Sequence, residues 1–356
     1  MPLLQVVPSL PPAVNGVGDY ATILARQLWE RHGVESSFVV GDPAWVPPPG
    51  GAEFPTRAVP ARTAGSLGEA LAAVPASGTI LLHYVPYGYA PRGCPFWLAD
   101  ALRDLRRRRP DLRLITVFHE LSADGERPWK SAYWLSPIQR RLGRRIGRLS
   151  GVRRMTTTRV AEQLRGMLAP DDQGVETVPV FSNLGEPASL LPTGQRQRRM
   201  VVFGTRTWRE EVYRRHLDGL LAACRHLGVE SILDVGSPLT SLPTGLPLPL
   251  AVHGLLRTED SPEVFGRSLA GFFTYPAAWL GKSGIFAAYC AHGLVPVTIP
   301  GNDEPSLEGL QPGVHYLVNG QGDAPEEVGR AAHAWYRQHC AAVHADGIHR
   351  AMLAAR

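Results

Sequence analysis

Short apolar runs alternate with longer amphipathic segments in the first half of this 356-residue chain. The expected strands are residues 3–7, 37–40, 79–83, 112–118, 155–158 and 177–181, and the expected helices between them are 21–31, 66–73, 96–108, 136–149 and 159–168. Strands that alternate with helices pair in parallel and carry helices on both faces. The pattern therefore predicts an α/β fold with a doubly wound sheet.

A stretch rich in Pro, Gly, Ser and Arg interrupts this alternation, and a second α/β series follows it. The second series has expected strands at 200–203, 231–235, 250–253, 270–275 and 295–299, and helices at 209–227, 261–269, 283–292 and 325–342. The chain is also long for one core. We expect two Rossmann-like domains, 1–185 and 200–324, that face each other across a cleft, with a linker at 186–199 and a C-terminal helical segment at 325–356.

Composition excludes several classes of protein. Hydrophobic residues make up 44% and charged residues 19%, which is typical of a globular chain. We see no membrane-spanning run and no signal peptide, so we expect a cytoplasmic protein. The four cysteines, Cys94, Cys224, Cys290 and Cys340, form no CxxC pair, which argues against a zinc site or a disulfide framework.

The excess positive charge of +5 lies in the first half, much of it in residues 106–109 and 137–154. Residues 137–149 read as a basic amphipathic helix. Its arginines form either a solvated face or a contact with anionic lipid at the inner membrane face or with an acidic ligand. Aromatic side chains are not interleaved with these arginines, so we expect no nucleic acid partner.

Two glycines follow the first strand, in the segment Gly16-Val17-Gly18-Asp19. Glycine lets a ligand approach the backbone because no Cβ intervenes. The spacing is not that of a dinucleotide-binding fingerprint. The segment is either a ligand loop or a turn that Asp19 caps.

Two histidines end neighbouring strands: His83 precedes Tyr84, and His119 precedes Glu120. Ligands bind at the carboxyl ends of parallel strands, so we expect these residues in the first domain's site. A single histidine is more often structural, but two at adjacent strand ends favour a site.

The second domain offers cations and glycines at two places. Thr205 and Arg206 follow strand 200–203, and Lys282-Ser283-Gly284 precedes a helix. A lysine beside helix N-terminal amides is suited to phosphate oxygens. The alternative is an ordinary exposed lysine. Pro276 stands where a P-loop requires glycine, so a P-loop is excluded.

Four segments in order carry a resemblance: 15–21, His119-Glu120, Phe203-Gly204 and 291–297. Together they resemble the retaining glycosyltransferases of family 4, which have the GT-B fold. The resemblance implies a nucleotide-sugar donor, a UDP- or GDP-sugar, held by the second domain, and an acceptor held by the first. It also implies a C-terminal helix that returns to the first domain, for which 326–339 is the candidate.

The chain departs from this family at two positions. Leu280 and Ala288 stand where family members carry paired glutamates, of which the second usually holds the nucleotide ribose. Ribose recognition would then come from Ser283 or from an acidic residue of the next loop: Asp303, Glu304 or Glu308.

The resemblance implies glycosyl transfer with retention. Because the chain has no Asp-x-Asp motif, we expect the reaction to need no metal ion, and we expect no cofactor. The expected catalytic residues are His119 and Lys282. The donor-binding residues are Gly16, Val17, Gly18, Thr205, Arg206, Ser283, Gly284 and Glu304. Those on the acceptor side are Asp19, His83, Tyr84 and Glu120, for a small-molecule, glycan or lipid-linked acceptor. The alternatives are a degenerate nucleotide-sugar-binding protein, or another GT-B enzyme such as an epimerase or phosphorylase.

Overall fold

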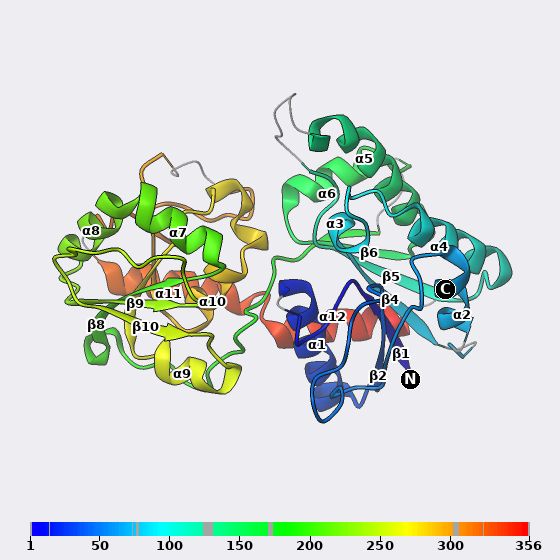
Figure 1. The fold of residues 1–356 in the computed structure, drawn as a ribbon, viewed down its shortest axis with the longest axis horizontal. Helices are drawn as coiled ribbons and strands as arrows, with labels where there is room; N and C mark the ends of the chain where they lie inside the picture. The colour runs from blue at the N-terminus through cyan, green and yellow to red at the C-terminus, as the bar shows by residue number, and fades with distance from the viewer. Residues whose placement is uncertain are drawn as a thin grey trace. The chain divides into compact units, whose positions relative to one another are not determined.

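The computed structural model describes residues 2–13, 15–72, 74–75, 78–123, 131–169, 174–301, 306–322 and 324–354. It consists of two compact units (Figure 1). Unit 1 comprises Met1–Pro179 and Ala341–Arg356, and unit 2 comprises Val180–Cys340. Glu304, which the sequence placed among the donor-binding residues, and Asp303 lie outside the described residues.

Unit 1 is built on a parallel sheet whose described strands run in the order β3-β2-β1-β4-β5-β6-β7. The strands are β1 (Leu3–Val7), β2 (Ser36–Val40), β3 (Thr56–Ala58), β4 (Thr79–Tyr84), β5 (Arg113–Phe118), β6 (Val152–Met155) and β7 (Val175–Thr177). Every residue of β1 and β4 is buried. Central strands covered on both faces have this nearly continuous apolar composition.

Helices follow the strands of unit 1 and cover the sheet (Figure 1). They are α1 (Gly16–His32), α2 (Ala64–Ala72), α3 (Pro86–Tyr89), α4 (Phe96–Arg108), α5 (Ser131–Leu149), α6 (Thr158–Arg165) and α12 (Ala341–Leu353). The α1 helix begins five residues earlier than expected because the Asn15 side chain caps it.

Unit 2 repeats this architecture with a parallel sheet in the order β10-β9-β8-β11-β12-β13. Its strands are β8 (Gln197–Phe203), β9 (Ser231–Val235), β10 (Leu250–Gly254), β11 (Ser268–Phe272), β12 (Val295–Thr298) and β13 (Leu317–Val318). Its helices are α7 (Arg206–Arg215), α8 (Leu217–His226), α9 (Ser261–Val264), α10 (Gly284–Ala291) and α11 (Pro325–Arg337), with 3₁₀ turns η1 (Thr193–Gln195), η2 (Thr258–Asp260) and η3 (Ala277–Lys282).

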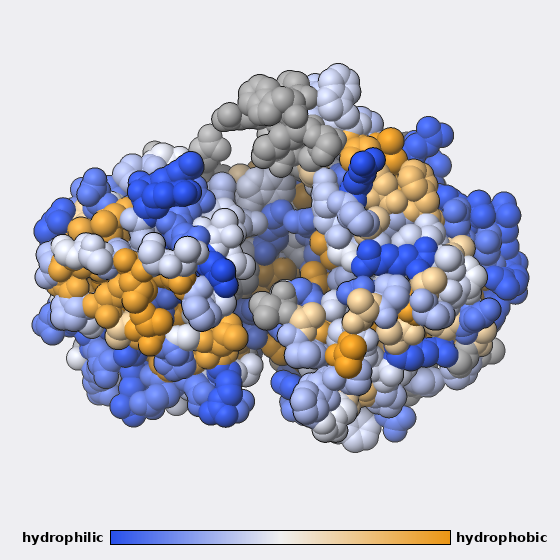
Figure 2. Space-filling view, in the orientation of Figure 1, coloured by the Kyte–Doolittle hydropathy of each residue, from blue (hydrophilic) through white to orange (hydrophobic). Residues whose placement is uncertain are grey.

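Apolar surface remains over the edge strand of the second sheet. Val252 on β10 and Leu255 just after it are exposed, as is Leu242 in the preceding loop, and Figure 2 shows hydrophobic surface over this part of unit 2. Among the described residues, no helix is both long enough and apolar enough to cross a lipid bilayer.

The strand expected at 155–158 is wrong in position, since β6 spans Val152–Met155. The first residues of β6 include Arg153 and Arg154, and two adjacent arginines are not typical of a buried strand. Both side chains are nevertheless buried, and Arg154 pairs with Glu176 on β7 at 3.1 Å. Thr157, which was expected inside the strand, instead caps α6.

The expected C-terminal helix is two helices that belong to different units. The α11 helix packs on α10 and β12 in unit 2, whereas α12 packs along α1 in unit 1. Arg113 on β5 donates to the carbonyls of Ala351 and Ala354 at the end of α12. The helix that belongs to unit 1 is therefore α12 and not residues 326–339. Residues 186–199, expected as a linker, belong to unit 2, and the last three of them lie in β8.

Candidate functional site

Three loops meet at the carboxyl edge of the first sheet. Strands β1, β4 and β5 are neighbours in the sheet, so the chain that leaves each of them emerges at one edge. The sequence predicted site residues at all three places. The backbone amides of His119 and Glu120 donate to the Tyr84 carbonyl at 2.9 and 3.4 Å. The ends of β4 and β5 are thereby joined.

The two glycines of α1 have different surroundings. A Cβ on Gly16 would meet nothing within 4 Å, so the backbone there is open. A Cβ on Gly18 would lie 2.7 Å from the Ser9 carbonyl oxygen, and the Gly18 amide donates to Asn15 Oδ1 at 2.6 Å. Packing and capping therefore account for Gly18. Val17 and Asp19 stand in the same first turn, and the cap is Asn15 rather than Asp19.

His83 and His119 form a buried pair. His83 Nδ1 lies 3.3 Å from His119 Nε2, and the two rings are stacked with centroids 5.6 Å apart. The ring of Tyr20, from α1, stands edge-on to both, at 5.7 Å from His83 and 5.0 Å from His119. Burial lowers the pKa of His119 to about 3 and that of His83 well below its usual value, so both rings are neutral near pH 7.

The Tyr84 side chain belongs to the core of unit 1. Its ring is fully buried and packs edge-on against Phe118, with centroids 5.3 Å apart. Its hydroxyl has no hydrogen-bond partner among the described residues. Glu120 is half-buried just beyond β5. Of these two residues expected on the acceptor side, Glu120 is therefore the more accessible.

In unit 2, a buried arginine organises the loop after β8. Gly204 has φ 141°, and a Cβ there would lie 2.7 Å from Ile285 Cδ1, so this loop packs on the start of α10. The Arg209 guanidinium donates to the Gly204 carbonyl at 3.0 Å and to the Ser237 carbonyl beyond β9. Arg209 also pairs with Asp234, whose other oxygen accepts from Tyr213 at 2.9 Å.

Thr205 and Arg206 begin the helix that follows this loop. The Thr205 hydroxyl is the α7 cap and accepts from the Trp208 amide at 3.5 Å. Arg206 is exposed as the first residue of α7. A cation thus stands at the carboxyl end of β8, on the loop that packs against α10.

Lys282 closes the 3₁₀ turn η3, immediately before α10. Its Nζ lies 4.8 Å from the centre of the Trp279 ring, a cation–π distance. Ser283 is buried and caps α10 by accepting from the Phe286 amide at 3.2 Å. Gly284 begins the helix, and its backbone is half-buried. Lys282 and Arg206 therefore lie on two segments that pack together through Gly204 and Ile285.

Three residues near this loop were not among the site residues expected from the sequence. Asn183 Oδ1 is buried without a hydrogen-bond partner among the described residues, and it lies 3.6 Å from where a Gly284 Cβ would be. Trp208 and Tyr275 form a tilted ring pair at 5.6 Å, beyond β8 and β11 respectively. Asn183 stood beside the expected linker and carried no signal, whereas an aromatic pair just beyond two expected strands could have been noticed.

The two positions that depart from the family pattern are in the core. Leu280 is 1% exposed and Ala288 is fully buried. His292, in the segment that carried part of the resemblance, is also buried, and its ring nitrogens contact the Ala288 carbonyl at 2.9 Å and the Ser261 hydroxyl at 3.1 Å. The role of His292 in this structure is therefore to tie α10 to α9.

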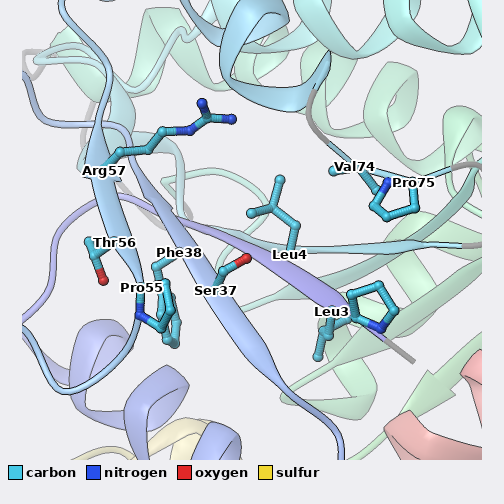
Figure 3. Close-up of a pocket in the computed structure, with 10 residues that line it drawn as sticks. Leu3, Leu4, Ser37, Phe38, Pro55, Thr56, Arg57, Val74 and Pro75 are labelled. Atoms are coloured by element: carbon cyan, nitrogen blue, oxygen red, sulfur yellow. The ribbon is translucent and has the colours of Figure 1, made fainter.

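Unit 1 also has pockets away from these residues, including one at the sheet and one between two helices. One, of about 390 Å³, is at the amino ends of β1, β2 and β3, and Figure 3 shows Leu4, Ser37 and Arg57 around it. It contains none of the predicted site residues. The other is a groove of about 490 Å³ between α4 and α5, lined by Phe96, Arg103, Ile138, Arg141, Leu142, Arg144, Arg145, Arg148 and Leu149. In the part of the chain that the structure describes, no three His, Cys, Asp or Glu side chains gather as metal ligands.

No family model matches the sequence. The search of curated proteins found no match either. Solved structures do match over nearly the whole chain. An alpha-glucosyltransferase in complex with UDP and a 13-mer DNA aligns with TM-score 0.62 and 10% identity, over 99% of this chain and 100% of that one.

Two further matches cover similar lengths. A putative UDP-N-acetylglucosamine 2-epimerase from Listeria monocytogenes aligns with TM-score 0.59 and 12% identity, over 99% of this chain and 95% of that one. A trehalose 6-phosphate synthase from Burkholderia multivorans aligns with TM-score 0.53 and 11% identity, over 99% and 98%. With two parallel α/β sheets, these likenesses confirm the predicted two-domain Rossmann-like fold of the GT-B type.

Proposed function

We propose that this protein transfers a sugar from a nucleotide-sugar donor to an acceptor hydroxyl. The observation that carries the proposal is that two cations and the start of α10 lie on two segments that pack together beyond the strands of the second sheet. Arg206 follows β8, Lys282 precedes α10, and the Gly204–Ile285 contact joins the two segments. Whole-chain likeness to a glucosyltransferase solved with UDP supports a uridine nucleotide as the donor's carrier.

In this proposal, unit 2 stabilises the leaving diphosphate. Charge builds on the diphosphate as its bond to the sugar breaks, and preorganised donors lower that barrier. Lys282, Arg206 and the amides at the start of α10 supply those donors, and Ser283 holds the first turn in place by capping it. The proposed reaction is metal-independent and retaining. The acceptor proton then passes to an oxygen of the departing diphosphate.

The base and ribose need contacts of their own. The tilted Trp208–Tyr275 pair lies beyond the same strand ends and offers ring faces to a uracil. For a ribose or sugar hydroxyl we propose Asn183, whose buried Oδ1 lies beside Gly284 and has no hydrogen-bond partner among the described residues. Accepting from a ligand requires this side chain to rotate towards the surface. The Ser283 hydroxyl already caps α10 and the Ala288 side chain has no polar atom, so we favour Asn183 over both as the hydroxyl contact.

In unit 1 we assign His119 to the donor sugar. It follows β5 at the sheet edge, beside the start of α1, where the Gly16 backbone is open. A neutral imidazole can hold a sugar hydroxyl without placing a positive charge near the developing oxocarbenium ion. His83 supports His119 from behind, and Glu120 and Asp19 remain proposed contacts for the acceptor.

The test is UDP and UDP-glucose binding by isothermal titration, followed by transfer assays. Lys282→Ala should weaken UDP binding about 10- to 100-fold, because a charge-assisted hydrogen bond contributes about 1.5–3 kcal/mol. Lys282→Arg should retain most of the affinity, and Arg148→Ala on α5 is the matched control. Unchanged UDP affinity in Lys282→Ala would remove this lysine from the site. Activity that is unaffected by EDTA would support the metal-independent scheme.

A second candidate is a nucleotide-sugar epimerase, because one whole-chain match carries that name and because Leu280 and Ala288 replace the paired glutamates. It predicts a new product from UDP-N-acetylglucosamine alone, with no acceptor. Binding without any turnover would instead indicate a degenerate binding protein.

The acceptor is proposed only by class: a small molecule, a glycan or a lipid-linked sugar. One match was solved with DNA, so the assay panel should include duplex DNA beside glycan and lipid acceptors. Our expectation of no nucleic acid partner predicts transfer to the glycan or lipid class and none to DNA.

A further inference from the structure

We propose that the buried hydrogen-bonded row Ser36–Gln5–His83–His119 fixes the tautomer of His119, so that its Nδ1 accepts a hydrogen bond from a hydroxyl of the donor sugar. Gln5 is the positioning residue that sets the direction of the row. The inference rests on the proposed glycosyl transfer, and its test has a readout that needs no substrate.

The row crosses four neighbouring strand positions of the first sheet. Ser36 lies on β2, Gln5 on β1 and His83 on β4, and His119 follows β5. Gln5 and His83 are fully buried, Ser36 is 6% exposed and His119 is 9% exposed. The contacts are 3.1 Å from Gln5 Nε2 to Ser36 Oγ, 2.8 Å from His83 Nε2 to Gln5 Oε1, and 3.3 Å from His83 Nδ1 to His119 Nε2.

The direction of donation follows from the orientation of the Gln5 amide between Ser36 and His83. The Gln5 amide nitrogen donates to Ser36, so its oxygen faces His83. An amide oxygen only accepts, so His83 must carry its proton on Nε2. A neutral imidazole has one N–H, which leaves His83 Nδ1 as an acceptor and requires His119 to donate from Nε2. The remaining nitrogen, Nδ1 of His119, is then an acceptor.

Neutrality of both rings is consistent with their burial, which lowers the pKa of each. The ring of Tyr20 stands edge-on to both imidazoles and so restrains their planes. The Tyr20 hydroxyl is itself engaged 2.6 Å from His344 Nδ1.

Nδ1 of His119 has no hydrogen-bond partner among the described residues, and it does not belong to their fully buried unpartnered atoms. His119 keeps 9% of its surface exposed just beyond β5, and we propose that Nδ1 is the atom that a ligand meets there. A sugar hydroxyl is the complementary donor. In the opposite tautomer, His119 Nδ1 would carry the N–H and donate, and the sugar hydroxyl would have to accept.

The first experiment measures the tautomer directly. Long-range ¹H–¹⁵N spectra of the full-length, ¹⁵N-labelled protein at pH 7.5 distinguish Nε2–H from Nδ1–H imidazoles, and His119→Asn assigns the His119 signals. The expected result is an Nε2–H tautomer for both His83 and His119. An Nδ1–H tautomer of His119, or an imidazolium, would overturn the proposal even if no variant folds.

The second experiment breaks the row at its start. Gln5→Met removes the acceptor and should turn the His119 signals into a mixture of tautomers, with kcat lowered about tenfold and the donor KM within about twofold. An unchanged His119 tautomer in Gln5→Met would contradict the positioning role.

The matched control is Thr116→Val, which removes a buried hydrogen bond from the same sheet, the 2.7 Å contact with Ser150. It should leave the His119 tautomer unchanged, and a change there would mean that any buried polar loss disturbs the row. The expected tautomer without turnover would count against the proposed function alone. The wrong tautomer with normal turnover would count against the row alone.

Discussion

At the scale of single residues, buried polar side chains hold together segments that are distant in sequence. Asp234 and Arg209 are almost fully buried and pair with each other, and Tyr213 donates to the same carboxylate. A buried ion pair stabilises little relative to an apolar pair, but removing one partner leaves an uncompensated charge. Substitution of one partner of such a pair is therefore expected to destabilise the protein, even where the residue contacts no substrate.

Arg209→Met should destabilise the protein by about 3–5 kcal/mol, because it strands the Asp234 carboxylate in the core. Adding Asp234→Leu should recover a large part of the loss, since the unpaired charge is then gone. Urea unfolding followed by circular dichroism measures both variants. A double variant whose loss equals the sum of the two single losses would show that the pair is not coupled.

A second residue-scale prediction concerns acid stability. Burial lowers the pKa of His339 to about 3, and its Nε2 has no partner among the described residues. Below the ordinary histidine pKa of about 6.5, His339 binds a proton in the unfolded chain but stays neutral in the folded chain. This histidine should therefore cost up to about 1.4 kcal/mol of stability per pH unit as the pH falls from 6.5 towards 4.

His339→Leu should reduce the slope of the unfolding free energy against pH between pH 6.5 and 4. The expected reduction corresponds to one bound proton, about 1.4 kcal/mol per pH unit. Urea midpoints at half-unit pH intervals measure it. The same substitution at His253, which is exposed on β10, is the control. Equal slopes in the wild type and in His339→Leu would show that His339 is not kept neutral by burial.

At the scale of elements, helix starts decide where the candidate site lies. Asn15, Thr205 and Ser283 each cap a helix that follows a strand, and each cap stands at the carboxyl edge of its sheet. A cap fixes the first turn, so the amides of that turn hold a constant direction. The α5 helix is different, because its exposed face carries arginines rather than a site.

The exposed face of α5 predicts adsorption to anionic surfaces. Trp134 is 69% and Ile138 40% exposed, next to arginines that line the α4–α5 groove. Arg145 is paired with Asp100 at 2.7 Å, so the informative variant changes Arg141, Arg144 and Arg148 to Gln. Flotation with phosphatidylglycerol vesicles should capture the wild type and release the variant. Absence of wild-type binding, or equal binding to neutral vesicles, would favour a merely solvated face.

At the scale of the whole molecule, unit 1 is assembled from two separate pieces of chain. Its last helix, α12, lies against α1 and supplies His344, whose ring meets Tyr20 and whose carbonyl accepts from Arg154. Arg31 on α1 also forms a paired contact with Asp346 at 2.9 Å. Unit 1 therefore depends on residues that the chain adds after completing unit 2.

A chain that ends at Cys340 should lose stability in unit 1 and keep unit 2 folded. Hydrogen exchange with mass spectrometry should show faster exchange in α1 and β5, whereas β8 and β11 keep their protection. Removal of residues 355–356 alone is the control. Equal loss of protection in both units would mean that they do not fold as separate bodies.

The sequence alone determined the two α/β series, most strand positions and the strand ends at which site residues should stand. Apolar runs and glycine positions are local signals, and parallel sheets place strand ends at one edge by rule. Strand β6 was expected three residues too late in the chain, because Arg153 and Arg154 look solvent-exposed until their partners are known. The break between α11 and α12 escaped it because periodicity continues across the boundary.

Only the tertiary structure decided which polar residues meet. Gln5 lies in an apolar strand 78 positions before His83, and nothing local connects them, yet adjacent strands bring them to 2.8 Å. Asn183 and Gly284 are likewise joined only by packing. The physical reason is that strand order and side-chain contacts depend on the free energy of the whole core. A sequence pattern covers a few neighbouring residues, so it predicts only their local structure.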